Sequence, residues 1–313
     1  MSKISRRNLL LTGSSVALSS VSSGWGAARE TSKWTPFRVS LNLGTLNSFR
    51  LSLEEEIDIA AQAGYSGIEL WASKVQQFLE KGGKLSDVRK RIKDHGLIVE
   101  CLITFFQWII DDDTKRTTGI EQMKKNMDWA LQLGTDRVAA TSSGATDQRL
   151  DDFRVLGDRY RTILEIGDVV GVVPMLEIWG MSHTLGSLAD ALAIAAWTDH
   201  PNVEFLLDVY HLFRGGSPFE GLALLNGRKI GGFHVNDYPA DPPREELEDH
   251  HRVYCGDGIA PLSMIFRLLR NIGYKGSLSF EVFNPTYRET NDPLLVAKTA
   301  LKKLNTILEK SFQ

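Results

Sequence analysis

From Pro36 onward, short apolar runs alternate eight times with longer stretches whose apolar residues recur at helical spacing. The short runs are the length of strands and several are bounded by glycine or by polar residues, which is typical of buried parallel strands. They are FRVSLNLG (37–44), GIELW (67–71), IVECLITF (98–105), DRVAATSS (136–143), VVPMLEIW (172–179), VEFLLDVY (203–210), IGGFHVND (230–237) and GSLSFEVF (276–283). Eight strand–helix repeats predict an α/β fold with a single domain at residues 36–313, a (β/α)8 TIM barrel.

The helical stretches carry boundary signals of their own. Ser52 followed by Glu55 predicts a capped helix start. Several helical stretches end in a glycine that suits the left-handed position past a helix, namely Gly64, Gly96, Gly134 and Gly273. A doubly wound open sheet is the alternative fold, but the first predicted strand runs into LNLGTLNS rather than into a glycine-rich phosphate turn. The barrel is therefore favoured.

The amino-terminal segment differs from the rest of the chain. Residues 1–29 place the pair Arg6 and Arg7 before a short Leu/Ala/Val/Ser stretch, and small residues follow around Gly26. This order is typical of an export signal, and Ser5 before the two arginines indicates the twin-arginine type. The apolar part is too short, and too often interrupted, to span a membrane. We expect a periplasmic or otherwise extracytoplasmic protein that is not inserted in the membrane once the signal is removed.

Charge and cysteine content exclude some classes of function. Residues 1–29 contain four basic and no acidic residues, so the formal net charge of −3 for the whole chain becomes −7 for the remainder. An acidic domain without long basic runs is a poor nucleic-acid binder, and we expect no nucleic-acid partner. Cys101 lies in an apolar run and Cys255 in a polar loop. Free thiols are favoured over a disulfide between them.

The last four predicted strands each end in a side chain that can bind a metal. These side chains are Glu177, Asp208, His234 and Glu281, each flanked by apolar neighbours. Each one alone is explained as well by a salt bridge or a helix cap. Strand ends of a closed barrel converge, however, so four such residues on successive strands predict one metal site. Three oxygen ligands and one nitrogen suit one divalent ion (Mn, Mg, Co or Zn), and the lack of thiolates disfavours a structural zinc.

This set of residues favours proton transfer next to a carbonyl group. A divalent ion that chelates a carbonyl and its neighbouring hydroxyl acidifies the adjacent C–H and stabilises an enediolate. Glu177 and Glu281 are the predicted catalytic acid and base, because they reach the metal from different directions. Isomerisation, epimerisation and β-elimination could all use this pair.

The motifs MLEIW, LLDVYH, FHVND, RVYCGDG and SFEVF together resemble the xylose isomerase-like TIM barrels, the sugar isomerase/epimerase superfamily, over residues 37–310. The resemblance to its ketose 3-epimerase branch implies that Glu177, Asp208, His234 and Glu281 hold the metal. It further implies that the two glutamates act on opposite faces of a sugar.

The same resemblance implies substrate contacts for His211, three residues after Asp208, and for Arg252, just before the GDG turn. His183 stands where that branch has a substrate-binding glutamate, which weighs against a free ketohexose as the substrate. For Arg252, a surface charge in the long loop at 238–258 is the other interpretation. Loops of this length inside a compact domain are usually functional.

Two further residues at strand ends are candidate substrate contacts. Glu69 could bind a sugar hydroxyl, and a salt bridge at the barrel rim explains it equally well. Trp179 could stack on a sugar, as could other aromatic residues near strand ends, although packing is the commoner role of such rings.

The leading hypothesis is an exported, metal-dependent isomerase or epimerase that acts on a small carbohydrate. A homo-oligomer is compatible with this hypothesis. The alternative is a lyase or dehydratase that performs β-elimination on a keto-sugar, keto-glycoside or inosose. An endonuclease IV-like enzyme would need extra histidines that the chain lacks at the ends of the second and third strands and in the seventh loop. A sugar-binding barrel without activity is disfavoured because the whole ligand set is present.

Overall fold

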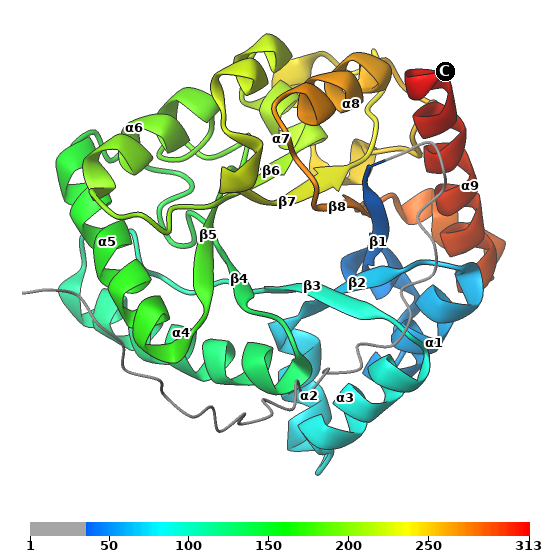
Figure 1. Cartoon of the computed structure of the whole chain (residues 1–313), viewed down its shortest axis with the longest axis horizontal. Helices are drawn as coiled ribbons and strands as arrows, with labels where there is room; N and C mark the ends of the chain where they lie inside the picture. Colours follow the sequence, from blue (N-terminus) through cyan, green and yellow to red (C-terminus); the bar gives the residue numbers. More distant parts are fainter. Residues whose placement is uncertain (1–35) are drawn as a thin grey trace, which may run out of the picture.

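A closed barrel of eight parallel strands forms the centre of the computed structural model, which describes residues 36–313 (Figure 1). The strands are β1 (Arg38–Asn42), β2 (Gly67–Trp71), β3 (Ile98–Ile103), β4 (Arg137–Ala140), β5 (Val173–Glu177), β6 (Phe205–Asp208), β7 (Ile230–Val235) and β8 (Ser277–Phe280). They pair in chain order, and β8 closes the barrel on β1. Each strand lies within the range predicted for it, so the (β/α)8 barrel is confirmed. The export signal predicted for residues 1–29 lies outside the described residues.

Helices surround the barrel on its outside (Figure 1). They are α1 (Leu53–Ala63), α2 (Ala72–Glu80), α3 (Leu85–Asp94), α4 (Asp113–Leu133), α5 (Phe153–Val170), α6 (Leu188–Thr198), α7 (Val209–Arg214), α8 (Leu262–Asn271) and α9 (Pro293–Phe312). Short 3-10 helices are η1 (Leu43–Phe49), η2 (Phe219–Leu224), η3 (Gly227–Lys229), η4 (Arg244–Glu246), η5 (Asp249–His251) and η6 (Pro285–Thr290). Among residues 36–313, none of the helices is both long enough and apolar enough to cross a lipid bilayer.

The predicted helix boundaries are confirmed where the sequence carried a cap. Ser52 Oγ accepts from the Glu55 backbone N–H at 3.2 Å, and Glu55 Oε2 accepts from the Ser52 N–H at 2.8 Å. The four glycines expected past helix ends all have positive φ, namely Gly64, Gly96, Gly134 and Gly273. Helix α4 begins at Asp113, where the Asp112 side chain accepts from the Lys115 backbone N–H and caps a first turn made of polar residues.

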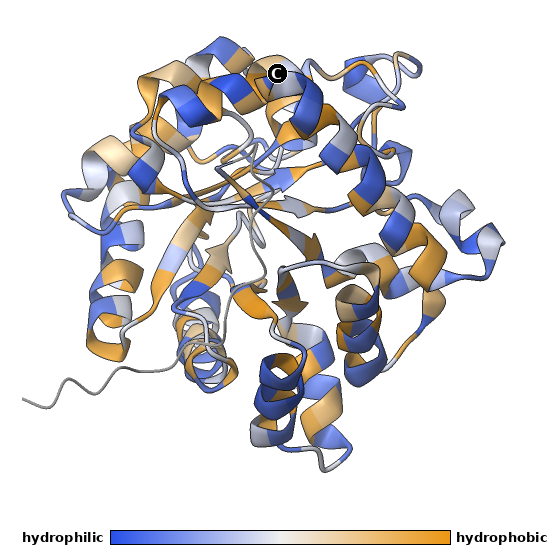
Figure 2. Cartoon of the chain, turned by 45° about the vertical axis from the view of Figure 1, so that its right-hand side comes forward, coloured by the Kyte–Doolittle hydropathy of each residue, from blue (hydrophilic) through white to orange (hydrophobic). Residues whose placement is uncertain are grey.

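Apolar side chains form one large core between the strands and the helices. Figure 2 shows largely hydrophobic strands and surrounding helices that carry both hydrophobic and hydrophilic residues. Inside the barrel a small cluster packs together, consisting of Cys101, Ile103, Ala139, Met175 and Leu206. Within the described part of the chain, both cysteines are buried free thiols, as expected. Met175 and Leu206 come two residues before Glu177 and Asp208 on their strands, so this cluster lies beneath the side chains at the carboxyl ends of the strands.

The long loop between β7 and α8 is held at several points. Asp237 and Val253 form an antiparallel bridge, and the Asp237 carboxylate accepts backbone N–H groups from Tyr238, Gly256 and Ala260. The carbonyl of Arg252 accepts from Asn284 Nδ2 at 3.0 Å. These bonds fix the part of the loop that carries Arg252 over the barrel mouth.

Candidate active site

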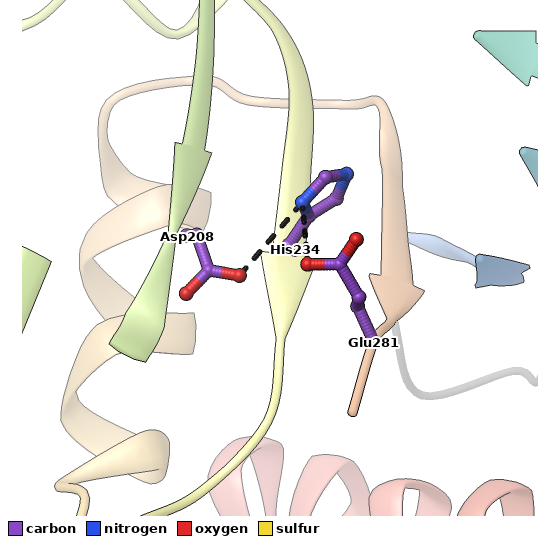
Figure 3. A group of neighbouring side chains, drawn as sticks. All are labelled: Asp208, His234 and Glu281. Atoms are coloured by element: carbon purple, nitrogen blue, oxygen red, sulfur yellow. Dashed lines mark ion pairs between the residues drawn. The ribbon is translucent and has the colours of Figure 1, made fainter. Parts of the chain in front are cut away.

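Three of the predicted metal ligands meet at the carboxyl ends of the last three strands (Figure 3). Asp208 ends β6, His234 is the next-to-last residue of β7, and Glu281 directly follows β8. Nδ1 of His234 lies 3.7 Å from Asp208 Oδ2 and 3.4 Å from Glu281 Oε2. One ligand atom from each residue lies within 4.8 Å of the others, and all three residues are buried.

Glu177 lies at the end of β5, outside this cluster, on the wall of a cavity that Glu281 also lines. Its Oε2 atom is buried and has no hydrogen-bond partner among residues 36–313. Burial raises the pKa of Glu177 to about 8, with Glu281 and Asp208 adding to the rise and His234 opposing it. The structure thus brings three of the four predicted ligands together and places the fourth beside them.

Charges within the cluster set its protonation. Burial would raise the pKa of Glu281, but His234 and Arg252 outweigh that effect and lower it to about 2. Burial also disfavours the charged form of His234, yet Glu69 and Glu281 hold its pKa well above the usual value. A carboxylate has to be ionised to bind a metal or to accept a proton, and the neighbouring cations keep Glu281 in that form.

Glu69 lies behind His234 rather than on the cavity. Its Oε2 atom is 2.9 Å from His234 Nε2 and accepts from Ser279 Oγ at 2.6 Å and from Asn42 Nδ2 at 3.1 Å. The side chain is buried and does not line the cavity. Of the two interpretations offered by the sequence, the position of Glu69 fits an ion pair, and it supports no direct contact with substrate.

Two asparagines complete the site, and the sequence reasoning missed both. Asn42, the last residue of β1, donates to Glu281 Oε1 at 2.7 Å as well as to Glu69. Asn236, just after β7, donates from Nδ2 to Asp208 Oδ2 at 3.0 Å. Each stands at the carboxyl end of a strand, which is the same signal that revealed the charged ligands. Both amides hold carboxylate oxygens in place.

Arg252 is buried in the site, so the surface-charge interpretation of this residue is wrong. Its Nη1 atom donates to Glu281 Oε2 at 2.7 Å, and Nη2 donates to Asp249 Oδ1 at 2.5 Å. Its guanidinium group lies 4.5 Å from the ring centre of Tyr210 and 5.1 Å from that of Phe283. The planar cation is held between aromatic faces and aimed at the carboxylates.

His211 lies on the cavity beside Arg252. Its Nδ1 atom accepts from the Gly180 N–H at 3.2 Å. Its Nε2 atom lies 3.0 Å from Nη2 of Arg252, a group that can only donate. Burial, and then the Arg252 charge, lower the pKa of His211 and favour the neutral ring. The ring and the guanidinium lie side by side on the cavity, where a substrate oxygen can reach both.

Of the predicted substrate contacts Trp179 and His183, only Trp179 lines the cavity. His183 is exposed and does not line it; its backbone accepts from Arg149 and donates to Thr146, which turns this part of the β5–α6 loop outward.

The cavity has a volume of about 410 Å³ and is lined by Trp71, Ile103, Phe105, Thr146, Glu177, Trp179, Met181, His211, Asp249, Arg252, Glu281 and Phe283. A cavity of this size fits a small-molecule ligand.

A (β/α)8 barrel with buried carboxylates and a histidine around one cavity at the strand ends defines the class of barrel enzymes that act on small molecules. The sequence matches the xylose isomerase-like TIM barrel family over residues 57–307, and the chain belongs to this family.

Known relatives are enzymes of small-molecule metabolism. The chain is 25% identical to inosose isomerase of Bacillus velezensis, over 83% of this chain and 94% of the relative. It is 28% identical to 3-dehydroshikimate dehydratase of Pseudomonas aeruginosa, over 76% of this chain but only 37% of that longer protein. The fructoselysine 3-epimerase of Escherichia coli is 22% identical over 83% of this chain and 94% of its own length. The chain is therefore an enzyme of a family that contains isomerases, epimerases and dehydratases.

Solved structures support the same assignment. The crystal structure of the IolI protein with a bound zinc atom superposes with a TM-score of 0.81 at 25% identity, covering 88% of this chain and all of that one. The structure of L-ribulose 3-epimerase shares the fold, with a TM-score of 0.69 at 21% identity over 88% of this chain and 95% of that one.

Proposed function

We propose that this protein is a metal-dependent isomerase or epimerase that moves a proton next to the carbonyl of a keto-sugar or a cyclic polyhydroxy ketone. The observation that carries the proposal is the buried cluster of Asp208, His234 and Glu281, with Glu177 on the same cavity. Inosose isomerase and fructoselysine 3-epimerase, as relatives, support this reaction type.

The residues around the cluster fit a divalent cation. Four carboxylates gather around the cluster, those of Glu69, Glu177, Asp208 and Glu281. The positive charges near them are Arg252 and, when it is protonated, His234. The buried Nδ1 of His234 and Oε2 of Glu177 have no hydrogen-bond partner in the described chain, and each such atom costs about 1–3 kcal/mol unless something else satisfies it. A divalent ion held by Asp208, His234 and Glu281, joined by Glu177, would supply Lewis-acid polarisation of the carbonyl.

The proton transfer falls to Glu177 and Glu281. Strands β5 and β8 are three strands apart in the barrel, so the two carboxylates reach the cavity from different directions. An epimerase needs a group on each face of the substrate, and an isomerase needs one that moves a proton between neighbouring carbons. Arg252 and His211, side by side on the cavity, would bind the substrate oxygen.

Proton exchange tests this function even when the identity of the product is unknown. The purified protein is analysed for bound metal and then incubated in D2O with an inosose, a ketohexose and a 3-keto-glucoside. We expect NMR to show loss of the C–H signal next to the carbonyl in at least one of them. Glu177→Gln should slow this exchange by about 10²- to 10⁴-fold.

Glu204→Gln is the matched control, because Glu204 pairs with Arg137 at the amino end of the barrel and touches no residue of the cavity. The control variant should exchange at the rate of the unchanged protein. Absence of exchange with every ketone, in protein that holds its metal, would overturn the proposal.

A dehydratase is the second candidate, because the dehydratase relative is 28% identical over 76% of this chain. β-Elimination begins with the same proton removal and differs in the departure of a group one carbon further on. The same NMR samples distinguish the two, since an eliminated product carries a new C=C bond and an epimerised product does not.

A further inference from the structure

Four aromatic rings form a continuous row on one side of the cavity. Phe283, Trp71, Phe105 and Trp179 follow one another with ring-centre distances of 5.9, 5.3 and 5.7 Å. All four line the cavity. We call this row the aromatic arc.

The arc lies one layer outward from the predicted catalytic residues. Trp179 is two residues beyond Glu177, Phe283 two beyond Glu281, and Trp71 two beyond Glu69. Trp71 is the last residue of β2, and Trp179 and Phe283 lie past the ends of β5 and β8, so these rings lie further along the chain, toward the carboxyl-end side of the barrel. A ligand whose carbonyl lies beside Glu281, in the cavity that the arc also lines, therefore has to extend past the arc.

The position of Trp71 is fixed before any ligand arrives. Its indole Nε1 donates to Asn42 Oδ1 at 2.6 Å. A Cβ atom on Gly44 would lie 2.6 Å from the Trp71 ring, so the ring packs directly on the Gly44 backbone. A preorganised ring loses little conformational entropy on binding.

The arc presents carbon rather than polar atoms. The Trp71 N–H is already used by Asn42, and the Trp179 N–H interacts with the Glu177 carboxylate. Phe105 has no polar atom and is 38% exposed at the mouth. A sugar hydroxyl against this surface would be desolvated without a hydrogen-bond partner, which is unfavourable. An apolar group there is stabilised in proportion to the apolar surface that it buries.

The polar groups of the cavity lie elsewhere. His211 and Asp249 line the cavity on the side of β6 and the β7–α8 loop, and Arg252 lies between them and the arc, with its guanidinium 5.1 Å from the ring centre of Phe283. The cavity thus has a charged end suited to a hydroxy-ketone and an aromatic side suited to a flat apolar group.

We propose that the substrate carries an aromatic group, which the arc binds while the keto-sugar or polyol part lies at the charged end. An aryl keto-glycoside has this chemistry, and a free sugar does not. The inference rests on the proposed function for the position of the carbonyl, and it adds the class of substrate.

The test compares two probes whose anomeric substituents are similarly poor leaving groups, methyl and benzyl 3-keto-β-D-glucopyranoside, the second being the aryl probe. Exchange of the C–H next to the ketone in D2O gives kcat/KM for each. We expect the aryl probe to be preferred by about tenfold or more, since burial of one ring gives at least that factor. Phe105→Ala should bring the ratio of the two kcat/KM values close to one.

Trp197→Ala is the matched control for loss of an exposed aromatic side chain, because Trp197 lies on α6 against Arg154, away from the cavity. It should keep the preference for the aryl probe. Equal kcat/KM values for the two probes in the unchanged protein would overturn the inference and leave the proposed function standing.

Binding without reaction separates the inference from the proposed function. Calorimetry with phenyl and methyl β-D-glucopyranoside, which have no ketone, should show tighter binding of the phenyl compound and loss of that difference in Phe105→Ala. This result, together with no exchange of either keto-probe, would support the aromatic site while the proposed reaction fails. Equal binding of both glucosides would count against the aromatic site.

Discussion

Oε2 of Glu69 lies 2.9 Å from Nε2 of His234, whereas Nδ1 of the same ring faces Asp208 and Glu281. A carboxylate on one side of an imidazole keeps the hydrogen on that side and leaves the other nitrogen free as a ligand. Glu69 is thus a positioning residue: it acts on a metal only through His234. Asn42 and Ser279 hold the Glu69 carboxylate in turn.

We predict that Glu69→Gln lowers metal affinity by about 10- to 100-fold, the usual effect of removing such a partner. The amide can donate to Nε2 as well as accept from it, so the orientation and tautomer of His234 are no longer fixed. Calorimetric titration of the metal-free protein with Mn²⁺ or Zn²⁺ measures the change. Glu100→Gln removes an equally well-paired strand carboxylate, which bonds Arg38 at the amino end of the barrel, and should leave metal affinity as it was. A similar loss in both variants would contradict the role of Glu69.

His234→Ala should have a larger effect on the metal than on the fold. The side chain supplies the one nitrogen of the three-residue cluster, so we expect metal affinity to fall by more than about 100-fold, beyond the loss caused by removing its partner. Circular dichroism should still show a folded barrel, since the apolar residues beneath the site stay in place. Unaltered metal affinity in a folded variant would show that His234 is not a ligand.

The sequence predicts the barrel and the residues at its strand ends because both follow from local periodicity. Apolar runs locate the strands, and Asp208, His234 and Glu281 occupy positions where a parallel barrel brings strand ends together. The role of Glu69 could not be predicted in this way. Its partners Asn42 and Ser279 lie on β1 and β8, so the contact depends on the register around the barrel, which no local pattern encodes.

The sequence alone also does not predict which loop residues face the cavity. His183 and Arg252 both follow strands and both were candidate substrate contacts, yet only Arg252 reaches the cavity. Asp237 and Asn284 fix the loop of Arg252 over the barrel mouth, whereas Arg149 binds the His183 carbonyl from outside. These long-range bonds decide which loop residue faces the site.

Export is the next prediction, and we propose that residues 1–29 direct it. Changing Arg6→Lys and Arg7→Lys together should remove the processed protein from the periplasmic fraction of a bacterial host, because the twin-arginine route depends on the arginine pair. Immunoblots of periplasm and cytoplasm measure the distribution. Arg29→Gln, outside the pair, is the control and should leave export intact. Continued export of the double variant would contradict the twin-arginine route, and cytoplasmic retention of the unchanged protein would contradict export itself.

A buried ion pair outside the site gives a prediction about stability. Glu56 on α1 is fully buried, and its Oε1 atom lies 2.7 Å from Nζ of Lys74 on α2. Burial raises the pKa of Glu56 from 4.5 to about 7, and Lys74 opposes the rise. We expect Lys74→Met to lower the free energy of unfolding by roughly 3 kcal/mol at pH 8, because it leaves a buried carboxylate without its counter-ion.

The loss of unfolding free energy in Lys74→Met should grow as the pH rises. A carboxyl group whose pKa is higher in the folded protein than in the unfolded chain binds more protons when folded, so its contribution to stability falls as pH rises between the two values. The pKa of Glu56 should rise further in Lys74→Met, and the variant should therefore be least impaired near pH 5 and most impaired above pH 7.

Adding Glu56→Gln should recover most of the stability at pH 8, since no buried charge then remains. Urea unfolding at both pH values measures this, with Lys90→Met as a control that breaks only an exposed pair with Asp94. Equal losses for Lys74→Met and Lys90→Met would show that burial of Glu56 does not matter.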